Sequence, residues 1–413
     1  MNYQEQKMRQ TQGIENAPLS GVRVLEFGHY AAGPFATMLL ADWGADVVKV
    51  EPVDGEPMRH WPPLVGKDSD GTFGMNFAAL NRNKRCVEID LKDPAGVSRA
   101  RELCKSADII LENFRPGVLK GLKLGFEDIV KINSDIVYCS VTGYGQTGPD
   151  RDKGAFDVAI QAASGIMSVT GEEGGPPAKC GLALADYGTG VFAALACVTA
   201  LRRAEKTGEP GYVDVSMLSC MLSLANLQTS EYWGSGTVPK RLGSRHPKAS
   251  PYQAYLGSDD KWFILAAGSD RLWHRVCDVI DASDLTDDPR FRTPGARAEN
   301  QVELEGILEE IFSKSPASVW LQKFDAASVP AAAINDYAEA LGSEHVRDGK
   351  LIHRMDLPDG GQTQTVGNPV RLSNFDFRIF HDPSDSGTHN EEVDAEWIGD
   401  GNGGSHSKSR MAG

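Results

Sequence analysis

The sequence predicts an α/β protein whose larger part is built on a parallel, doubly wound sheet. In the first half of the chain, short apolar segments typical of strands alternate with segments that carry an apolar helical face. Parallel strands joined by right-handed helical crossovers produce this alternation. Near residue 225 the pattern changes, because Tyr- and Trp-rich segments mix with polar turns. The 413 residues are enough for more than one domain, so a smaller α+β domain is expected there.

The predicted elements of the first half alternate along the chain. The spacing predicts strands over 22–28, 45–51, 86–91, 108–114 and 135–143, with helices over 32–43, 93–106 and 126–133. The second helix has a clear start signal, since Asp93 fits the N-cap and Pro94 the first helical position. A long apolar helix over 186–206 and a strand over 211–218 are expected to follow.

Composition predicts the tails and the domain boundaries. Residues 1–17 are polar and residues 399–413 are rich in Gly and Ser, so a disordered arm and a disordered tail are expected. Residues 18–225 are expected to form the first part of the large domain, and 226–330 the small domain. Residues 331–398 are expected to return to the large domain.

The charge balance limits the possible partners. The formal net charge is -15, from 57 acidic and 42 basic side chains. A surface of this sign repels nucleic acid and anionic membranes, so neither is an expected partner. No stretch is expected to supply the roughly 18 uncharged apolar residues that a membrane span needs. An anionic ligand would require a local cationic site.

The cysteine pattern favours a reducing compartment. Seven cysteines are present, an odd number, and no pair has CxxC spacing. This argues against both a disulfide framework and a structural zinc site. The first 20 residues are polar and lack the apolar run of a secretory signal. A cytoplasmic location is therefore expected, and the scattered histidines predict no metal site.

One glycine motif suggests a dinucleotide site, but its context does not. Residues 143–148, GYGQTG, match G-x-G-x-x-G and follow a predicted strand. The next residues, PDRDKG, open a loop, so no helix N-terminus is available to hold a pyrophosphate. The first strand-to-helix turn, 28–34, and Glu51 at the end of the second strand occupy positions that a nucleotide site would use. An NAD-dependent oxidoreductase therefore remains an alternative.

The segment from 181 to 218 is the most informative for chemistry. Asp186 lies at the start of a long apolar helix that begins with small residues. One interpretation is a plain N-cap aspartate that accepts backbone N–H bonds. The other is a carboxylate nucleophile whose ionised form the helix dipole stabilises. In that case Gly188 and Gly190 would leave room for a bulky substrate.

Several long motifs in a consistent order resemble the family III CoA-transferases, which include formyl-CoA transferase and carnitine-related CoA-transferases. The resemblance runs from about residue 18 to residue 399. Its fold is shared by α-methylacyl-CoA racemase. The motifs that carry it are PLSGVRVLEFGHYAAGPFATMLLADWGADVVKVEP, NRNKRCVEIDLKDPAG, ADIILENFRPGVLKGL, VTGYGQTGP, the Asp186 segment and HPKASPYQAY.

The resemblance implies a fold, an assembly and a reaction. It implies a Rossmann-like large domain built from both ends of the chain, a smaller domain between them, and an interlocked homodimer. It also implies that Asp186 attacks an acyl-CoA thioester, forms a mixed anhydride and then an aspartyl-CoA thioester, and passes CoA to an acceptor carboxylate. An acyl-CoA and a carboxylic acid are then the partners, with the coenzyme A thioester as substrate and no permanently bound cofactor.

Further site residues are implied by their positions in the matching motifs. Tyr30 and Ala31 match the loop beside the thioester, and Met217 matches a residue near the pantetheine. The nucleotide part of CoA is expected to contact Ile89, Asp90, Leu91, Lys92, Asn113 and Phe114.

The phosphates of CoA require cations in a chain this acidic. Lys84, Arg85 and Arg115 are basic residues near the matching motifs. Each is either a phosphate contact or a solvated surface charge.

Departures from the family pattern bear on the reaction. Phe156 stands where the racemase branch has a histidine, and its ring cannot exchange a proton with an α-carbon. An acyl-CoA racemase or epimerase is therefore the disfavoured alternative on this fold. Asp157 matches an acidic residue near the nucleophile, or else caps a helix.

The acceptor region also differs from formyl-CoA transferase. Ala31 replaces a glutamine that helps hold the small substrate there, and no run of four glycines is present. Residues 243–255, GSRHPKASPYQAY, occupy the corresponding region, where Arg245 or His246 would be able to meet a second carboxylate. A carboxylate larger than formate or oxalate is therefore expected.

Overall fold

A computed structural model of the chain describes residues 15–67 and 71–399, and they form two compact units. The larger unit contains the chain up to Ile166, Cys180–Gly234 and the chain from Asp348 onward. The smaller unit contains Met167–Lys179 and Ser235–Arg347. The arm and tail expected at 1–17 and 399–413 lie outside the described residues, except for 15–17 and 399.

The unit boundaries differ from the expected domain boundaries. The main segment of the smaller unit begins at Ser235 instead of 226 and extends to Arg347 instead of ending at 330, and Met167–Lys179, expected in the large domain, also belongs to it. The reason is β11 (Ala331–Ala333), which pairs with β10 (Trp262–Ala266) and so belongs to the sheet of the smaller unit. The large unit is nevertheless built from both ends of the described chain.

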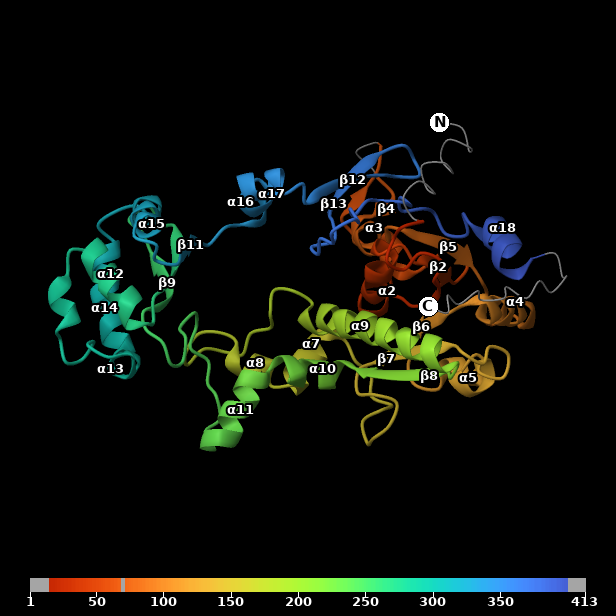
Figure 1. Ribbon diagram of the computed structural model, residues 1–413, viewed down its shortest axis with the longest axis horizontal. Coiled ribbons are helices and arrows are strands. Elements are labelled where there is room, and N and C mark those ends of the chain that lie inside the picture. The colour runs from red at the N-terminus through yellow and green to blue at the C-terminus, as the bar shows by residue number, and fades with distance from the viewer. Residues whose placement is uncertain (1–14, 68–70, 400–413) are drawn as a thin grey trace. The chain divides into compact units, whose positions relative to one another are not determined.

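A six-stranded parallel sheet forms the centre of the large unit (Figure 1). Its spatial order is β5-β2-β1-β6-β7-β8. If the short β3–β4 pair is set aside, this is the 3-2-1-4-5-6 order of a Rossmann-like sheet. The strand bounds are β1 (Arg23–Phe27), β2 (Asp46–Glu51), β5 (Lys84–Glu88), β6 (Ile109–Glu112), β7 (Val137–Thr142) and β8 (Gly211–Ser216).

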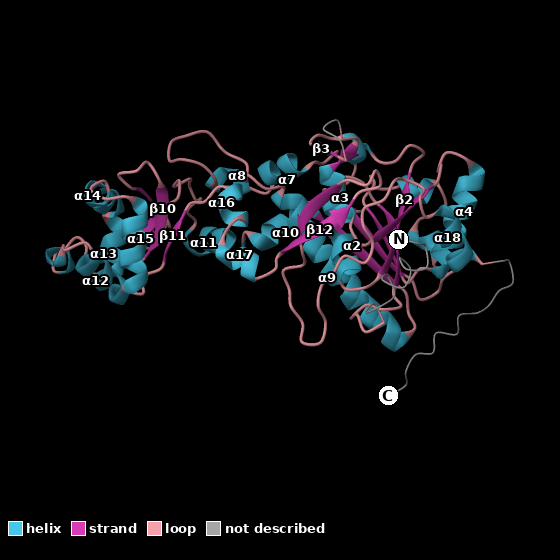
Figure 2. Ribbon diagram, turned by 90° about the horizontal axis from the view of Figure 1, so that it is seen from above, coloured by secondary structure: helices cyan, strands magenta, loops and turns pink. Residues whose placement is uncertain are grey.

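Alternate side chains of these strands enter two separate cores. On one face, Val24 and Val47 pack with α2 (Ala32–Asp42) and α9 (Leu184–Thr207). On the other face, Leu25 lies in a core that α4 (Pro94–Ser106) shares with Val393 and Trp397 near the end of the described chain. Figure 2 shows α4 and α18 side by side, so distant parts of the sequence cover the same face.

Asp93 caps α4 as predicted, because its Oδ1 accepts a hydrogen bond from the N–H of Ala95 at 3.1 Å. The predicted helix over 126–133 is shorter, since α6 spans only Phe126–Ile129. The remaining elements of the large unit are η1 (Pro57–His60), β3 (Leu64–Val65), β4 (Phe73–Gly74), α3 (Met75–Asn81), α5 (Val118–Gly121), α7 (Asp157–Ala163), α10 (Met217–Leu224), α11 (Asn226–Ser235), β12 (Ile352–Asp356), β13 (Gln362–Val366), α18 (Asn390–Val393) and η3 (Asp394–Ile398).

Helix α9 is long and apolar enough to cross a membrane by length and composition, although Asp186 and Arg202 limit its uncharged stretch to residues 187–201. Its most apolar window has a mean hydropathy of 1.5, and 39% of that window is buried. The helix packs on α2, β7 and β8 of the large unit. A core helix meets the same length criterion, so this feature does not identify a membrane span.

The smaller unit is an α+β structure with its own core. Its three-stranded antiparallel sheet has the order β11-β10-β9, with β9 at Tyr252–Leu256. Helices bury Trp273, Phe312 and Phe324 against it. The helical elements are α12 (Asp270–Val279), η2 (Ser283–Thr286), α13 (Pro294–Glu299), α14 (Gln301–Phe312), α15 (Ala317–Ala326) and α16 (Tyr337–Leu341), while α8 (Ile166–Val169) and α17 (Glu344–Asp348) lie at the boundaries.

A buried ionic cluster lies between the sheet and α2. Glu26 on β1 accepts hydrogen bonds from Lys49 Nζ at 2.8 Å and Lys84 Nζ at 2.9 Å. Lys84 Nζ also donates to the carbonyl of Pro34 in α2 at 2.8 Å. The cluster consists of three acids and three bases, all nearly inaccessible to solvent: Glu26, Glu51, Glu56, Lys49, Arg59 and Lys84.

The acidic and basic side chains of the cluster compensate one another's charge. Burial opposes ionisation of Glu26, but Lys49 and Lys84 lower its pKa to about 2. Burial lowers the pKa of Lys84 to about 8 in spite of Glu26. Arg59 and Glu51 form a bidentate pair at 2.6 and 2.7 Å beside them.

Lys84 and Arg85 are therefore structural residues. Lys84 is a member of the ionic cluster, and Arg85 pairs with Asp46 at 2.7 Å and Glu396 at 2.8 Å. Both side chains are buried among carboxylates, so neither is the phosphate contact nor the solvated surface charge considered from the sequence. Alternation along β5 sends them to opposite faces of the sheet.

Replacing Lys84 tests the cluster. Lys84→Met leaves the buried cluster with three acids and only two bases, so it should lower the free energy of unfolding by about 3–5 kcal/mol. Denaturant unfolding would measure the loss. Lys105→Met, which breaks an exposed pair with Glu102, should change stability by less than about 1 kcal/mol. Equal effects of the two substitutions would contradict the proposed role of the cluster.

Candidate active site

A cavity of about 360 Å³ opens at the carboxyl ends of β1 and β6, the neighbouring strands at which the strand order of the parallel sheet reverses. Ligands bind at this position in open α/β sheets. All its lining residues belong to the large unit. They come from five segments: His29–Ala32, Asn113–Val118, Val141–Gly143 with Arg151–Phe156, Asp186 on α9, and Met217 at the start of α10.

Asp186 lies in this cavity, in the first turn of α9. The N-cap of α9 is Ala183, so Asp186 is not the N-cap residue that one sequence interpretation proposed. Burial raises the pKa of Asp186 to about 7, and the nearby charge of Asp157 adds to the effect. Burial therefore opposes the ionised form that the helix dipole was expected to stabilise.

Asp157 caps α9 from a neighbouring helix. Its Oδ1 accepts a hydrogen bond from the N–H of Ala185 at 2.8 Å, one residue before Asp186. Its Oδ2 accepts another from Gln161 Nε2 at 2.8 Å, and Gln161 Oε1 in turn accepts from the N–H of Cys180. Asp157 thus occupies the positive end of the helix that would otherwise stabilise the Asp186 carboxylate.

Aromatic rings form one wall of the cavity. The ring centroid of Tyr30 lies 4.7 Å from His29, 5.4 Å from Trp61 and 6.3 Å from Phe156. Phe156 is exposed, lines the cavity with Asp186, and presents a carbon ring at the position of the racemase histidine. The cavity therefore has no proton-exchanging group at residue 156.

Asn113 contributes to the cavity mainly by holding its loop. Its Oδ1 accepts from the N–H of His29 at 3.0 Å, and its Nδ2 donates to the carbonyl of His29 at 2.9 Å. Both ends of the amide are thereby engaged by the main chain. Phe114 packs against His29 with ring centroids 5.2 Å apart. Sequence reasoning missed His29, although it directly precedes the predicted Tyr30 and Ala31.

Gly188 and Gly190 serve helix packing. A Cβ on Gly188 would lie 2.8 Å from Met221 Cε, and one on Gly190 would lie 2.8 Å from Phe35 Cδ1. Their small size therefore permits α10 and α2 to approach α9 closely. The sequence interpretation, in which these glycines leave room for substrate, was wrong because the two residues face other helices.

Three cations line the cavity, and only one of them was expected. Arg151 and Lys153 lie on the loop after β7, next to Asp152 and Asp150 respectively. Arg115 is exposed, and among the described residues no carboxylate pairs with it. The RDK sequence after GYGQTG was a signal for the two missed cations. The same loop holds no helix before α7, as predicted.

Other expected contacts lie outside the residues that line this cavity. Ile89 is in the core beneath α4, and Asp90, Leu91 and Lys92 continue from β5 at the same carboxyl edge of the sheet. Arg245 and His246 belong to the smaller unit. There Arg245 is paired with Glu173 and Glu305, so its guanidinium already has two carboxylate partners.

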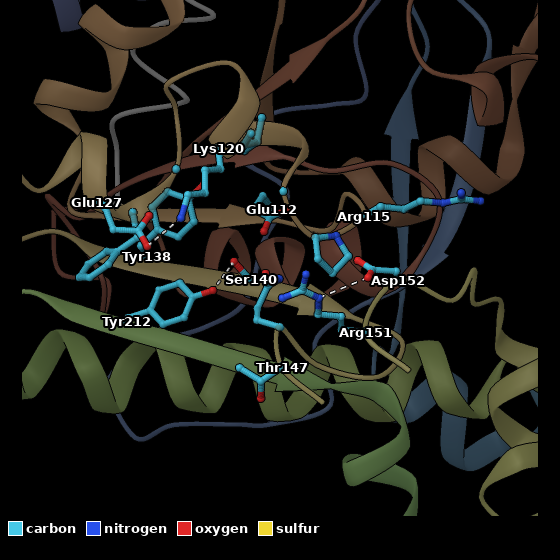
Figure 3. A pocket seen from close by; sticks show the side chains of 16 residues that line it. Glu112, Arg115, Lys120, Glu127, Tyr138, Ser140, Thr147, Arg151, Asp152 and Tyr212 are labelled. Atoms are coloured by element: carbon cyan, nitrogen blue, oxygen red, sulfur yellow. Dashed lines mark hydrogen bonds and ion pairs between the residues drawn. The ribbon is translucent and has the colours of Figure 1, made fainter. Parts of the chain in front are cut away.

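A second cavity of about 470 Å³ adjoins the first and shares Arg115, Pro116 and Arg151 with it (Figure 3). Glu112 lies among its lining residues, and burial raises the pKa of this carboxyl to about 7. Oε2 of Glu112 accepts from the N–H of Phe114 at 2.9 Å. Glu112 therefore connects the second cavity to the loop that lines the first.

The family is decided by comparison with known proteins. The sequence profile of CoA-transferase family III matches residues 19–390. The chain belongs to CoA-transferase family III. The motif resemblance is thereby confirmed, and the cavity around Asp186 is the candidate active site of a CoA-transferase that acts in acyl-CoA metabolism.

Curated relatives and a solved structure agree with this assignment. The chain is 36% identical to human succinyl-CoA:glutarate CoA-transferase over 91% of this chain and 85% of the relative. It is also 36% identical to the acetyl-CoA:oxalate CoA-transferase of Acetobacter aceti, over 87% of this chain and 90% of the relative. A CaiB/BaiF family protein from Brucella suis superimposes with a TM-score of 0.83 at 33% identity, covering 92% of this chain and 100% of the other.

The pH dependence of stability tests the environment of Asp186. Because its folded pKa of about 7 exceeds its ordinary value near 3.8, the native state keeps a proton that the unfolded state releases. Stability should therefore fall as the pH rises from about 4 to 7. Asp186→Asn removes this loss, so it should stabilise the protein more at pH 8 than at pH 5, by no more than about 4 kcal/mol.

Thermal unfolding of wild type and variant at both pH values would measure this difference. Glu102→Gln, at an exposed carboxylate on α4, is a matched control that should shift the midpoint little at either pH. A gain for Asp186→Asn that is equal at pH 5 and pH 8 would mean that Asp186 ionises normally.

Proposed function

We propose that the chain transfers CoA from an acyl-CoA donor to a free carboxylic acid, with Asp186 as the nucleophile. The observation that carries the proposal is the Asp186 carboxyl in a cavity at the carboxyl edge of the sheet, with its pKa raised to about 7. A carboxylate of higher pKa is the stronger nucleophile, and near pH 7 about half of it is ionised.

The first half of the reaction removes the donor acyl group. The Asp186 carboxylate attacks the thioester carbonyl carbon, the C–S bond breaks, and CoA leaves as a thiolate. The thiolate then attacks the aspartyl carbonyl of the mixed anhydride, which releases the donor acid and leaves an aspartyl-CoA thioester. Formation of the anhydride and then of the aspartyl thioester thus replaces the direct reaction of a thioester with a free carboxylate.

The second half repeats these steps with the acceptor. The acceptor carboxylate attacks the aspartyl thioester, CoA thiolate leaves again, and an anhydride links Asp186 to the acceptor. The thiolate attacks the acceptor carbonyl, which forms the new acyl-CoA and restores the Asp186 carboxylate. No electron transfer occurs in these steps, so the scheme needs no redox cofactor.

Arg115 is the proposed anchor for the anionic part of CoA. Its guanidinium has no carboxylate partner in the described chain, whereas Arg151 and Lys153 are each paired with an aspartate. An unpaired guanidinium offers charge-assisted hydrogen bonds to phosphate. This local site would offset the charge of -15 that repels anions elsewhere. The remaining expected contacts, Ile89–Lys92 and Met217, lie at the same carboxyl edge or in the cavity.

A dicarboxylic acid is the proposed acceptor. The relatives with 36% identity are named for glutarate and for oxalate, which both carry two carboxyl groups. Two cations besides the proposed CoA anchor, Arg151 and Lys153, line the cavity of this chain and are candidates to meet a second carboxylate. Ala31 lines the cavity with a side chain smaller than the glutamine it replaces, which supports an acid longer than oxalate.

An interlocked homodimer is the proposed assembly. Helices α9, α10 and α11 each expose large apolar side chains, among them Leu195, Leu224, Leu227 and Trp233. Leu227 and Trp233 are 75% and 78% exposed, which is unusual for large apolar residues outside an interface.

The seven cysteines are all free, which supports a reducing cytoplasm as the proposed location.

Trapping the covalent intermediate tests the nucleophile. Wild type incubated with succinyl-CoA and then hydroxylamine should acquire a hydroxamate on the peptide that contains Asp186, detectable by mass spectrometry. Asp186→Ala should lack the adduct and lose at least about a thousandfold in kcat. Asp93→Asn, which keeps a good N-cap on α4 away from the cavity, should retain both. A fully active Asp186→Ala enzyme would refute the mechanism.

The same assay tests the acceptor. Glutarate should accept CoA with a kcat/KM at least about tenfold higher than butyrate, because only glutarate presents a second carboxylate to the cations. A preference for butyrate would contradict the dicarboxylate proposal. Uptake of deuterium at Cα of a 2-methylacyl-CoA without acceptor acid would instead favour a racemase.

Substitution of Arg115 tests the anchor. Arg115→Ala should raise the KM for succinyl-CoA about tenfold, since a charge-assisted hydrogen bond contributes about 1.5–3 kcal/mol, and should change kcat little. Arg101→Ala on α4 removes an arginine far from the cavity lining and should leave both constants unchanged. An unchanged KM in Arg115→Ala would exclude this anchor.

A further inference from the structure

The loop that carries Tyr30 is held by its main chain. The carbonyl of Gly28 accepts from Lys49 Nζ at 2.7 Å, and both main-chain groups of His29 bind the Asn113 amide. The N–H of Tyr30 donates to Glu56 Oε2 at 2.9 Å. Side chains from three separate segments therefore satisfy four consecutive polar groups of this loop.

Tyr30 adopts a backbone conformation that is unfavourable for its residue type. Its φ is +62°, in the left-handed region that glycine tolerates and a bulky residue avoids. Such a conformation persists only where the surroundings impose it. The hydrogen bond from the Tyr30 N–H to Glu56 is one of the contacts that impose it.

Contacts within the ionic cluster hold Glu56 itself in place. It is 1% exposed, its Oε1 lies 3.2 Å from Lys49 Nζ, and its own N–H donates to Glu51 Oε2 at 3.0 Å. Glu56 is absent from the cavity lining, so it has no direct access to a substrate there. Its carboxylate instead joins the ionic cluster to the loop on the cavity wall.

We propose that Glu56 is a positioning residue that holds Tyr30 in its left-handed conformation and so places the Tyr30 ring on the wall of the Asp186 cavity. The inference rests on the proposed function for its effect on catalysis, since Tyr30 acts there as part of the wall that receives the thioester. The ionic cluster thereby reaches the loop main chain at two points, Gly28 through Lys49 and Tyr30 through Glu56, and only the second holds the residue with the left-handed conformation.

A double-mutant cycle tests this role. Glu56→Asp keeps the charge beside Lys49 but withdraws the carboxylate by one methylene from the Tyr30 N–H. Tyr30→Gly removes the ring and relieves the left-handed conformation. Glu56→Asp should lower kcat/KM for succinyl-CoA about tenfold in the wild-type background and less than about twofold in the Tyr30→Gly background. Equal losses in both backgrounds would overturn the proposal.

A control separates positioning from stability. Asp42→Asn breaks another buried pair, with Arg82 at 2.8 Å, at the far end of α2. It should lower the unfolding midpoint while leaving kcat/KM within about twofold of wild type. If Asp42→Asn instead reduces kcat/KM as much as Glu56→Asp does, loss of stability explains both effects and the proposal fails.

Amide hydrogen exchange gives a readout that does not require activity. The peptide containing residues 28–31 should be protected in wild type and should exchange at least about tenfold faster in Glu56→Asp. If wild type transfers no CoA but shows this dependence, the positioning role stands and the proposed function fails. If wild type is active and exchange does not depend on Glu56, the proposed function stands and the positioning role is refuted.

Discussion

The ionic cluster between α2 and the sheet is the constraint on which the active-site geometry depends. Glu26 binds two lysines from β2 and β5, and Lys84 reaches the carbonyl of Pro34 in α2. A buried charge without its partner is costly, so these contacts favour one register of the strands and one placement of α2. The loop between β1 and α2 is consequently fixed at both ends, and this loop forms a wall of the cavity.

Asp186 is a second carboxyl group removed from solvent, but its electrostatic surroundings are opposite to those of Glu26. Glu26 is surrounded by cations and has a pKa of about 2, whereas Asp186 faces an aspartate and has a pKa of about 7. Asp157 accepts hydrogen bonds from the N-terminus of α9 and from Gln161. These two donors therefore stabilise the Asp157 carboxylate and not the Asp186 carboxylate. The Glu26 carboxylate stabilises the fold. The Asp186 carboxylate is destabilised as an anion, which favours the nucleophilic role proposed for it.

Local patterns in the sequence predicted most of the large unit. The parallel sheet, α2, α4 and α9 were found because apolar spacing and capping residues such as Asp93 act within a few positions of each other. The sequence-based predictions were wrong at positions whose structure depends on contacts between distant segments. Gly188 faces α10 rather than the cavity, Lys84 is buried beside Glu26, and residues 331–333 add a strand to the sheet of the smaller unit.

The sequence by itself determined the alternation of strands and helices and the family, and it singled out Asp186 as the candidate nucleophile. Tertiary structure alone decided the ionisation of Asp186, the partners of Lys84 and Arg245, and the cations around the cavity. The physical reason is that a pKa and an ion pair depend on burial and on charges brought from distant segments. Periodicity and capping, in contrast, depend on neighbours along the chain.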